Sequence, residues 1–105
     1  MIILKFGGTS VGKPERMKKV ADLVLSSPDK KIVVLSALSG TTNALVSIGN
    51  SLLAGQGAKA EEEIRSLQKH YEAFVTELYS SPPFAAIGQE IVSRFFVFIR
   101  LLAAG

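Results

Sequence analysis

The 105-residue chain contains no cysteine and no tryptophan, and it has a single histidine. The absence of cysteine excludes disulfide bonds, thiolate catalysis and zinc–thiolate sites, and it is compatible with a reducing compartment. The histidine, His70, stands between Lys69 and Tyr71, with no nearby aspartate, cysteine or second histidine to form a metal site or a catalytic triad. We expect His70 to lie on a helix surface or in helix packing.

Long apolar runs are also absent. The N-terminal apolar stretch is very short and leads directly into glycines, so we do not expect it to be a signal peptide. The other candidate, residues 91–104, is shorter than the roughly 18–20 residues that a membrane span needs, and Arg94 and Arg100 interrupt it. We therefore expect no membrane association and a last helix that is buried by protein.

Neither sign of charge dominates the chain. The formal net charge is +3, and the basic residues are dispersed without interleaved aromatic residues, so we expect no nucleic-acid partner. The one cluster, from Lys13 to Lys19, fits the solvated face of a helix. With 48% hydrophobic and 20% charged residues, the chain is a folded domain rather than a disordered tail, and its length suffices for one domain.

The apolar pattern predicts a βαβ unit followed by helices. Residues 1–6 and 31–36 are short, β-branched apolar runs, typical of parallel strands covered on both faces. Residues 14–26 between them have helical periodicity, and Pro14 suits the first helical position. We therefore expect an α/β fold in which the two strands are parallel. Three more helical patterns cover about 41–53, 58–80 and 84–103.

Two of these helices have informative faces. In the helix at 41–53, the spacing of Leu45, Ile48 and Leu52 predicts that all three face inward. The last helix is apolar nearly all round, which requires burial on several sides, yet the preceding residues supply only two strands and a few helices. We infer that the chain is the N-terminal part of a larger α/β unit, or that it associates through this helix, for example as a homo-oligomer.

Small polar residues follow both predicted strands. Lys5 and the turn Gly7-Gly8-Thr9-Ser10 follow the first strand, and residues 36–43 follow the second. The carboxyl ends of parallel strands share one edge, where open α/β sheets usually bind ligands. Free backbone N–H groups before a helix favour a phosphate, so the first loop predicts an anion site with Lys5 as its cation. The alternative is that Gly7 and Gly8 merely permit a sharp turn.

Two familiar nucleotide motifs do not match. Residues 7–13 fit most of a Walker A loop, but the residue after Lys13 is Pro14, which has no hydroxyl to hold magnesium. The pattern G-x-G-x-x-G of dinucleotide-binding folds is absent. The lysine expected to bind phosphate in the predicted site is therefore Lys5 on the strand rather than Lys13 in the loop.

The stretch Lys5-Phe6-Gly7-Gly8-Thr9-Ser10-Val11 resembles the N-terminal signature of aspartate kinases, members of the amino-acid kinase superfamily. Residues 34–43 are similar to the second motif of that family. The resemblance implies a three-layer parallel-sheet amino-acid kinase fold, of which residues 1–105 are the N-terminal portion of a single, incomplete domain. Kinases of glutamate, acetylglutamate, carbamate and uridylate share part of the motif, but Phe6 and the Thr-Ser-Val continuation favour aspartate kinase.

The resemblance also implies an activity. Aspartate kinases transfer the γ-phosphoryl group of MgATP to the side-chain carboxylate of L-aspartate, giving 4-phospho-L-aspartate. This is the first step towards lysine, threonine and methionine, and it takes place in the cytoplasm. Lys5 would neutralise the transferring phosphoryl group, and Ser36 and Thr42 would lie near the aspartate. The residues implied to contact ATP are Lys5, Phe6, Gly7, Gly8, Thr9 and Ser10.

The rest of the family's active site has no counterpart here. Its substrate-binding acid and arginine, its catalytic-region aspartate, the adenine pocket and the regulatory modules lie further along than this chain reaches. We therefore predict that the 105-residue chain alone has no kinase activity. The alternatives are another kinase of the superfamily, of the glutamate or acetylglutamate type, and a non-catalytic binding or assembly module.

Overall fold

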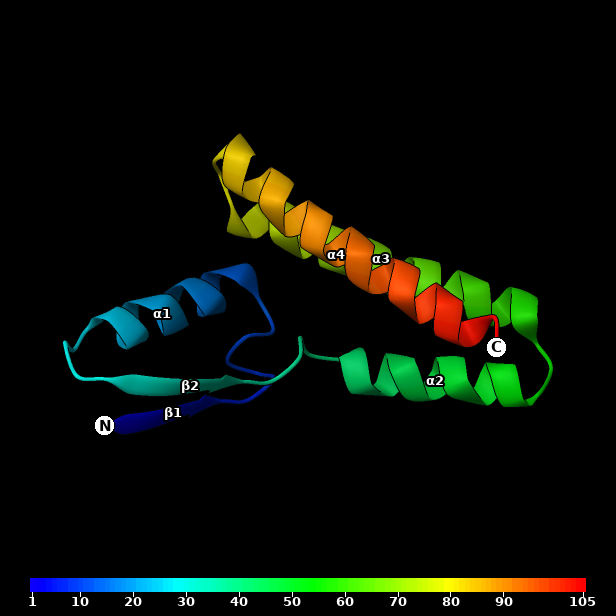
Figure 1. The fold of residues 1–105 in the computed structure, drawn as a ribbon, viewed down its shortest axis with the longest axis horizontal. Coiled ribbons are helices and arrows are strands. Elements are labelled where there is room, and N and C mark those ends of the chain that lie inside the picture. The colour runs from blue at the N-terminus through cyan, green and yellow to red at the C-terminus, as the bar shows by residue number, and fades with distance from the viewer. The chain divides into compact units, whose positions relative to one another are not determined.

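The computed structural model describes residues 1–105 as two compact units, Met1–Thr41 and Thr42–Gly105. The predicted order of strands and helices is confirmed, and each predicted boundary lies within about two residues of the observed one (Figure 1). The elements are β1 (Ile2–Phe6), α1 (Pro14–Leu25), β2 (Lys31–Leu35), α2 (Thr41–Leu53), α3 (Gly57–Leu78) and α4 (Pro82–Ala103).

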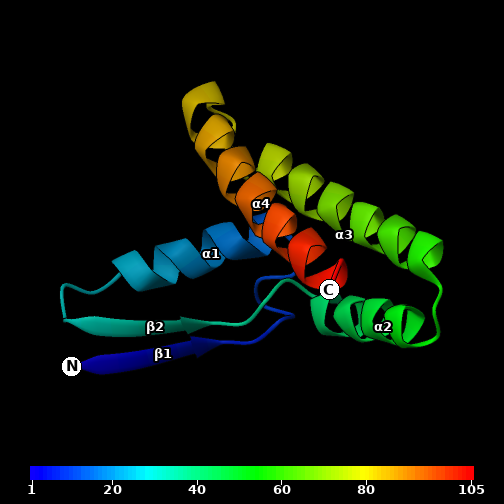
Figure 2. The same cartoon turned by 45° about the vertical axis from the view of Figure 1, so that its right-hand side comes forward.

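The first unit is a βαβ unit. Strands β1 and β2 pair in parallel, with Phe6 opposite Leu35. The Ser36 N–H donates to the Phe6 carbonyl at 3.0 Å and so extends the ladder to the strand ends. Helix α1 lies alongside both strands in two views (Figures 1 and 2). The predicted parallel pairing is therefore confirmed.

Helix α1 begins where the sequence predicts. Pro14 occupies its first turn, and Lys13 before it is extended, with φ −136° and ψ 147°. The Lys13 carbonyl accepts hydrogen bonds from the N–H groups of Arg16 and Met17, at 3.1 and 3.0 Å. Because proline has no N–H to leave unsatisfied, it suits the first helical turn. The helix thus starts directly after the first loop.

The apolar side chains of the sheet remain largely exposed. Ile3 is 68% exposed, and Val34 and Leu35 are 46% and 52% exposed. The first unit by itself therefore does not supply the cover predicted for both strand faces. Apolar strand faces are stable when covered, and the larger α/β unit or partner expected from the sequence stays a prediction. The third layer of the expected fold stays a prediction.

The second unit is built on a helical hairpin. Helices α3 and α4 lie side by side (Figures 1 and 2), and Gly88 lets them approach closely, because a Cβ there would lie 2.8 Å from Val75 Cγ1. The rings of Tyr71 and Phe96 meet edge to face at 5.8 Å. None of the helices has an apolar stretch long enough to cross a membrane. The buried core consists of Ile48, Ala60, Ile64, Leu67, Val75, Val92 and Phe96.

One prediction about α2 is wrong. Leu45 and Leu52 are exposed, at 42% and 37%, and only Ile48 of the three predicted residues is buried. Ser51, which is 3% exposed, takes an inward position instead, because its hydroxyl donates to Glu63 of α3 at 2.5 Å. The hydrogen bond compensates the burial of the hydroxyl. Apolar periodicity alone could not reveal this partner.

Polar contacts also hold α4 in place. The Arg100 guanidinium donates to Glu61 at 3.1 Å and to Gln68 at 2.6 Å, both on α3. Arg94 pairs with Glu90 one turn earlier on α4. His70 is exposed and meets Tyr71 edge to face at 6.1 Å, in agreement with its predicted surface position.

The carboxylate of Glu63 links α3 to α2 and makes stability depend on pH. The hydroxyls of Ser47 and Ser51 both donate to it, and these hydrogen bonds, with a smaller effect of Lys59, hold the pKa of Glu63 below its ordinary value of 4.5. A pKa lowered by folding stabilises the folded state above the unfolded pKa. That contribution is lost as pH falls through the folded pKa. We therefore expect Glu63→Gln to lower the thermal midpoint at pH 7 and to lower it less at pH 3, which is below the ordinary pKa of 4.5.

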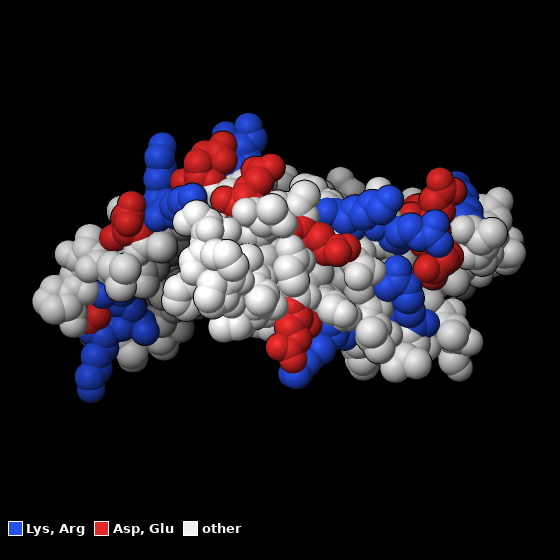
Figure 3. Space-filling model, turned by 90° about the horizontal axis from the view of Figure 1, so that it is seen from above, with Lys and Arg blue, Asp and Glu red and all other residues white.

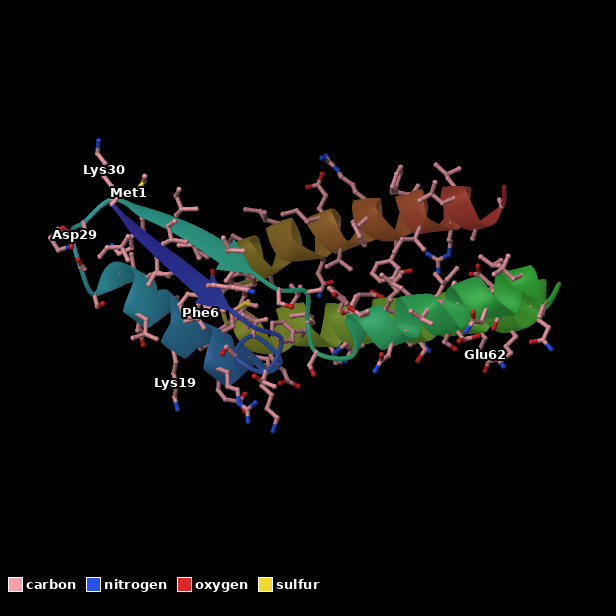
Figure 4. The ribbon with its side chains drawn as sticks, turned by 90° about the horizontal axis from the view of Figure 1, so that it is seen from below. Met1, Phe6, Lys19, Asp29, Lys30 and Glu62 are labelled. Atoms are coloured by element: carbon pink, nitrogen blue, oxygen red, sulfur yellow. The ribbon has the colours of Figure 1, made fainter.

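Circular dichroism melts at the two pH values test this expectation. The exposed neighbour Glu62, labelled on α3 in Figure 4, provides the control, and Glu62→Gln should leave the midpoint unchanged at both values. An equal loss from Glu63→Gln at pH 3 and pH 7 would show that the charge of Glu63 is not what stabilises the contact.

Candidate active site

The first predicted loop is fixed by its own backbone and by α1. After Phe6 at the end of β1, the Ser10 N–H donates to the Gly7 carbonyl at 3.0 Å and closes a turn. The Arg16 guanidinium donates to the Thr9 carbonyl at 3.0 Å. The loop is therefore held between a strand end and a helix start, the geometry in which backbone N–H groups bind phosphate.

The two predicted loops lie against each other. A Cβ placed on Gly8 would be 3.7 Å from the Ser36 hydroxyl oxygen and 3.7 Å from the Ala37 carbonyl oxygen. Both loops also follow the carboxyl ends of adjacent parallel strands. Figure 4 shows Phe6 at this end of the strands and Met1 and Lys30 at the other. The expectation that the two loops share one edge of the sheet is confirmed.

Gly12 is a contact residue that the sequence did not single out. A Cβ on Gly12 would lie 2.9 Å from the Gly8 carbonyl oxygen and 3.0 Å from Ser39 Cβ. No side chain fits there, so Gly12 allows the start of α1 to close onto both loops. In the sequence, Gly12 stands out only as part of an incomplete Walker pattern.

Replacing Gly12 by alanine should open this contact. We expect a cost of about 1–3 kcal/mol from overcrowding. Amide hydrogen exchange in the β1 and β2 peptides should then become about tenfold faster or more, as read by mass spectrometry. Gly7→Ala is the matched control, because nothing lies within 4 Å of its Cβ position and its φ is not positive. Unchanged exchange in Gly12→Ala would contradict the close contact.

The other predicted residues occupy distinct positions. The Lys5 side chain is exposed near the end of β1 and forms no ion pair or side-chain hydrogen bond. Ser36 directly follows β2 and faces Gly8. Thr42 is the second residue of α2 and begins the second unit, so it is not part of the geometry described for the first. The structure therefore brings Ser36 to the first loop but does not define the position of Thr42 relative to it.

Charge is distributed unequally between the units. Residues 1–41 contain seven lysines and arginines but three acids, whereas residues 42–105 contain five against six. The unit that carries both loops is therefore the basic one, which favours a polyanionic ligand. Figure 3 shows basic and acidic side chains interspersed on the face it draws, without a continuous basic patch.

A hollow of about 350 Å³ lies beside the first loop along α1. Phe6 stands at the end of β1 next to α1, and the exposed Lys19 points away from the strands (Figure 4). The lining of the hollow thus combines apolar side chains with hydroxyl and cationic groups. Its lining residues are Phe6, Thr9, Ser10, Arg16, Lys19, Val20 and Leu23.

These features define an α/β unit with a glycine-containing loop between strand and helix at the carboxyl edge of its sheet. The model of the amino acid kinase family matches residues 1–98, and the chain belongs to that family. No cluster of histidine, aspartate or glutamate side chains able to hold a metal ion occurs in the structure.

Curated relatives of the chain are aspartokinases. The chain is 41% identical over 68 residues to lysine-sensitive aspartokinase 3 of Escherichia coli, a match that covers 65% of this chain and 15% of that protein. It is 42% identical over 78 residues to chloroplastic aspartokinase 2 of Arabidopsis thaliana, covering 73% of this chain and 13% of the relative. The resemblance to the N-terminal part of aspartate kinases is thereby confirmed.

A shorter relative also matches. The putative inactive aspartokinase 3 of Haemophilus influenzae is 42% identical over 57 residues, which make up 54% of this chain and 47% of that protein. That relative is therefore itself a short chain. Against the two larger relatives, this chain spans less than a sixth of their length.

Proposed function

We propose that this chain forms the phosphate-binding wall and part of the aspartate pocket of an aspartate kinase. The reaction is transfer of the γ-phosphoryl group of MgATP to the side-chain carboxylate of L-aspartate. The observation that carries the proposal is the contact of Gly8 and Gly12 with residues 36–39, because it joins a phosphate loop to a second polar loop at one sheet edge.

Each residue of the first loop has a role in this proposal. Lys5 places an unpaired cation at the strand end, where it can stabilise the charge that develops on the transferring phosphoryl group. The backbone N–H groups of Gly7 and Gly8 bind phosphate oxygens. The space around Gly7 is open, since no atom lies within 4 Å of its Cβ position. Thr9 and Ser10 lie beside the phosphates, with Phe6 next to them.

Magnesium enters this proposal with the nucleotide. The first loop offers hydroxyl and backbone groups, which suit phosphate oxygens, and it contains no carboxylate. When bound, the ion would neutralise phosphate charge, and no side chain of this loop would be needed to hold it. Ser36 and Thr42 are assigned to the aspartate, through hydrogen bonds from their hydroxyls to its carboxylates.

The proposal also includes the complete domain, the compartment and the pathway in which the kinase acts. Residues 1–105 form the N-terminal portion of one incomplete domain, which completes a three-layer fold with further residues. The kinase acts in the cytoplasm at the first step towards lysine, threonine and methionine. Because half of the phosphate site and most of the aspartate site are missing here, the chain alone does not turn over ATP.

Nuclear magnetic resonance of the ¹⁵N-labelled chain tests the site assignment without requiring catalysis. Addition of MgATP should shift the amide resonances of Gly7, Gly8, Thr9 and Ser10 more than those of α3 or α4. The Lys5→Ala variant should weaken these shifts while its spectrum stays folded. Shifts confined to other regions, or none at millimolar nucleotide, would contradict a phosphate site in this loop.

A further inference from the structure

Arg16 is the side chain of α1 that hydrogen-bonds to the first loop. It is the third residue of the helix, and its own N–H donates to the Lys13 carbonyl at 3.1 Å. Helical side chains lean towards the N-terminus of their helix, so the arginine reaches back over the loop that precedes α1. There its guanidinium donates to the Thr9 carbonyl at 3.0 Å. The helix and the loop are thereby joined by a side chain as well as by the backbone.

This contact fixes one peptide group of the loop at both ends. The peptide group joins Thr9 to Ser10, and its carbonyl accepts from Arg16. Its N–H donates to the Gly7 carbonyl at 3.0 Å. Because a peptide group is planar, the two hydrogen bonds together define its orientation. Without the Arg16 guanidinium, the same peptide group would be held at its N–H end alone.

The carbonyls of the loop are turned towards the chain itself. Those of Gly7 and Thr9 accept the two hydrogen bonds described above. The Gly8 carbonyl lies against Gly12, 2.9 Å from its Cβ position. All peptide bonds are trans, so each N–H points away from the carbonyl of its own peptide group. The N–H groups of Gly8 and Thr9 form no hydrogen bond within the chain and are left available to an anionic ligand.

Lys19 separates the effect of this contact from that of charge alone. Arg16 and Lys19 are both exposed, each carries one positive charge, and both line the hollow beside the first loop. Lys19 lies about one turn further along α1 and forms no ion pair or side-chain hydrogen bond, and its side chain points away from the strands (Figure 4). Both cations attract phosphate through space, but the guanidinium of Arg16 also holds the loop.

We propose that Arg16 is a positioning residue of the phosphate site. Through the Thr9 carbonyl it holds the first loop in the form that presents the N–H groups of Gly8 and Thr9 to the phosphates of a nucleotide. The inference rests on the proposed function, in which this loop binds MgATP. Arg16 itself does not touch the nucleotide; it orders the loop before the ligand binds, and a preformed loop loses less conformational entropy on binding.

Nuclear magnetic resonance of the ¹³C,¹⁵N-labelled chain tests the contact without nucleotide. Arg16→Met keeps an unbranched side chain and removes every donor. The Thr9 carbonyl carbon and the Ser10 amide should shift, and hydrogen exchange of the Ser10 amide should become about tenfold faster, because the turn opens more easily. Lys19→Met is the matched control and should leave both resonances in place. Unchanged β1 and β2 resonances in both variants show that the fold is retained.

Titration with MgATP, followed through the loop amides, tests the consequence for binding. Arg16→Met should raise the dissociation constant about tenfold, as expected for loss of one charge-assisted hydrogen bond. Lys19→Met should raise it less than about threefold. Arg16→Lys keeps a donor for the Thr9 carbonyl and should recover most of the affinity. The ratio between Arg16→Met and the parent chain should persist from about 0.05 to 0.5 M salt, because screening weakens attraction between charges but does not replace the lost contact.

The outcomes distinguish this inference from the proposed function. A parent chain whose loop amides do not respond to MgATP would contradict the proposed function, and the role of Arg16 with it. Where the parent chain binds MgATP, three results would overturn the role of Arg16 alone: an unchanged Thr9 carbonyl resonance in Arg16→Met, equal losses of affinity in Arg16→Met and Lys19→Met, or a loss that vanishes at high salt.

Discussion

Replacing Lys5 by alanine should lower the turnover of a chimeric aspartokinase by about 10²–10³-fold. In this chimera, the stretch that matches Escherichia coli lysine-sensitive aspartokinase 3 replaces its counterpart in that enzyme. The loss follows because Lys5 is the unpaired cation at the end of β1, next to the loop that would cradle the phosphates. Phosphoryl transfer depends mainly on positioning and charge stabilisation. A coupled assay of ADP release measures the effect.

Lys13 provides the matched control for Lys5. It is the lysine of the incomplete Walker pattern, and it lies exposed before Pro14 at the start of α1. Lys13→Ala should change turnover by less than about threefold, as expected for a charge that does not act in the transition state. If Lys13→Ala were the inactive variant and Lys5→Ala the active one, the assignment of the phosphate-binding lysine would be wrong.

Replacing Phe96 by alanine should unfold the helical unit or leave it only marginally stable. Phe96 is 1% exposed, packs in the core of the second unit and meets the ring of Tyr71. Truncating a buried phenylalanine costs about 3–5 kcal/mol, a large fraction of the stability of a small domain. Denaturant unfolding followed by far-ultraviolet circular dichroism should show a midpoint shifted to much lower denaturant.

The neighbouring Phe95 makes this prediction selective. It is 56% exposed and not part of the core, so Phe95→Ala should change the unfolding free energy by less than about 1 kcal/mol. The two variants should be compared at low protein concentration, so that self-association does not contribute. Equal losses from the two variants would mean that the core does not lie on the Phe96 face of α4.

The fold was predictable where local pattern and burial coincide. Short β-branched runs predict β1 and β2, and Pro14 marks the start of α1. The inward face of α2 was not predictable, because Ser51 is buried through a hydrogen bond to Glu63, twelve residues away on another helix. The sequence also does not predict which segment buries the sheet. Apolar strands indicate that their faces need burial, but they do not indicate what provides it.

The candidate site was also predictable in part from the sequence. The order of strand, glycine turn and helix places Lys5 and Gly7 at the carboxyl edge, and the parallel strands bring Ser36 to the same edge. Gly12 was missed because its role depends on a close approach to Gly8 and Ser39 that only three-dimensional packing reveals. The assignment of Thr42 to the aspartate stays a prediction, because α2 carries it into the second unit.

In the proposed function, this chain supplies one wall of an aspartate kinase site whose remaining parts lie in further residues. The most direct test is ATP turnover by the 105-residue chain and by the unsubstituted chimera, each with aspartate and with glutamate. We expect no turnover by the chain alone, and turnover by the chimera with aspartate within about tenfold of the parent enzyme and far above that with glutamate. Turnover by the isolated chain, a folded but inactive chimera, or a preference for glutamate would contradict the claim.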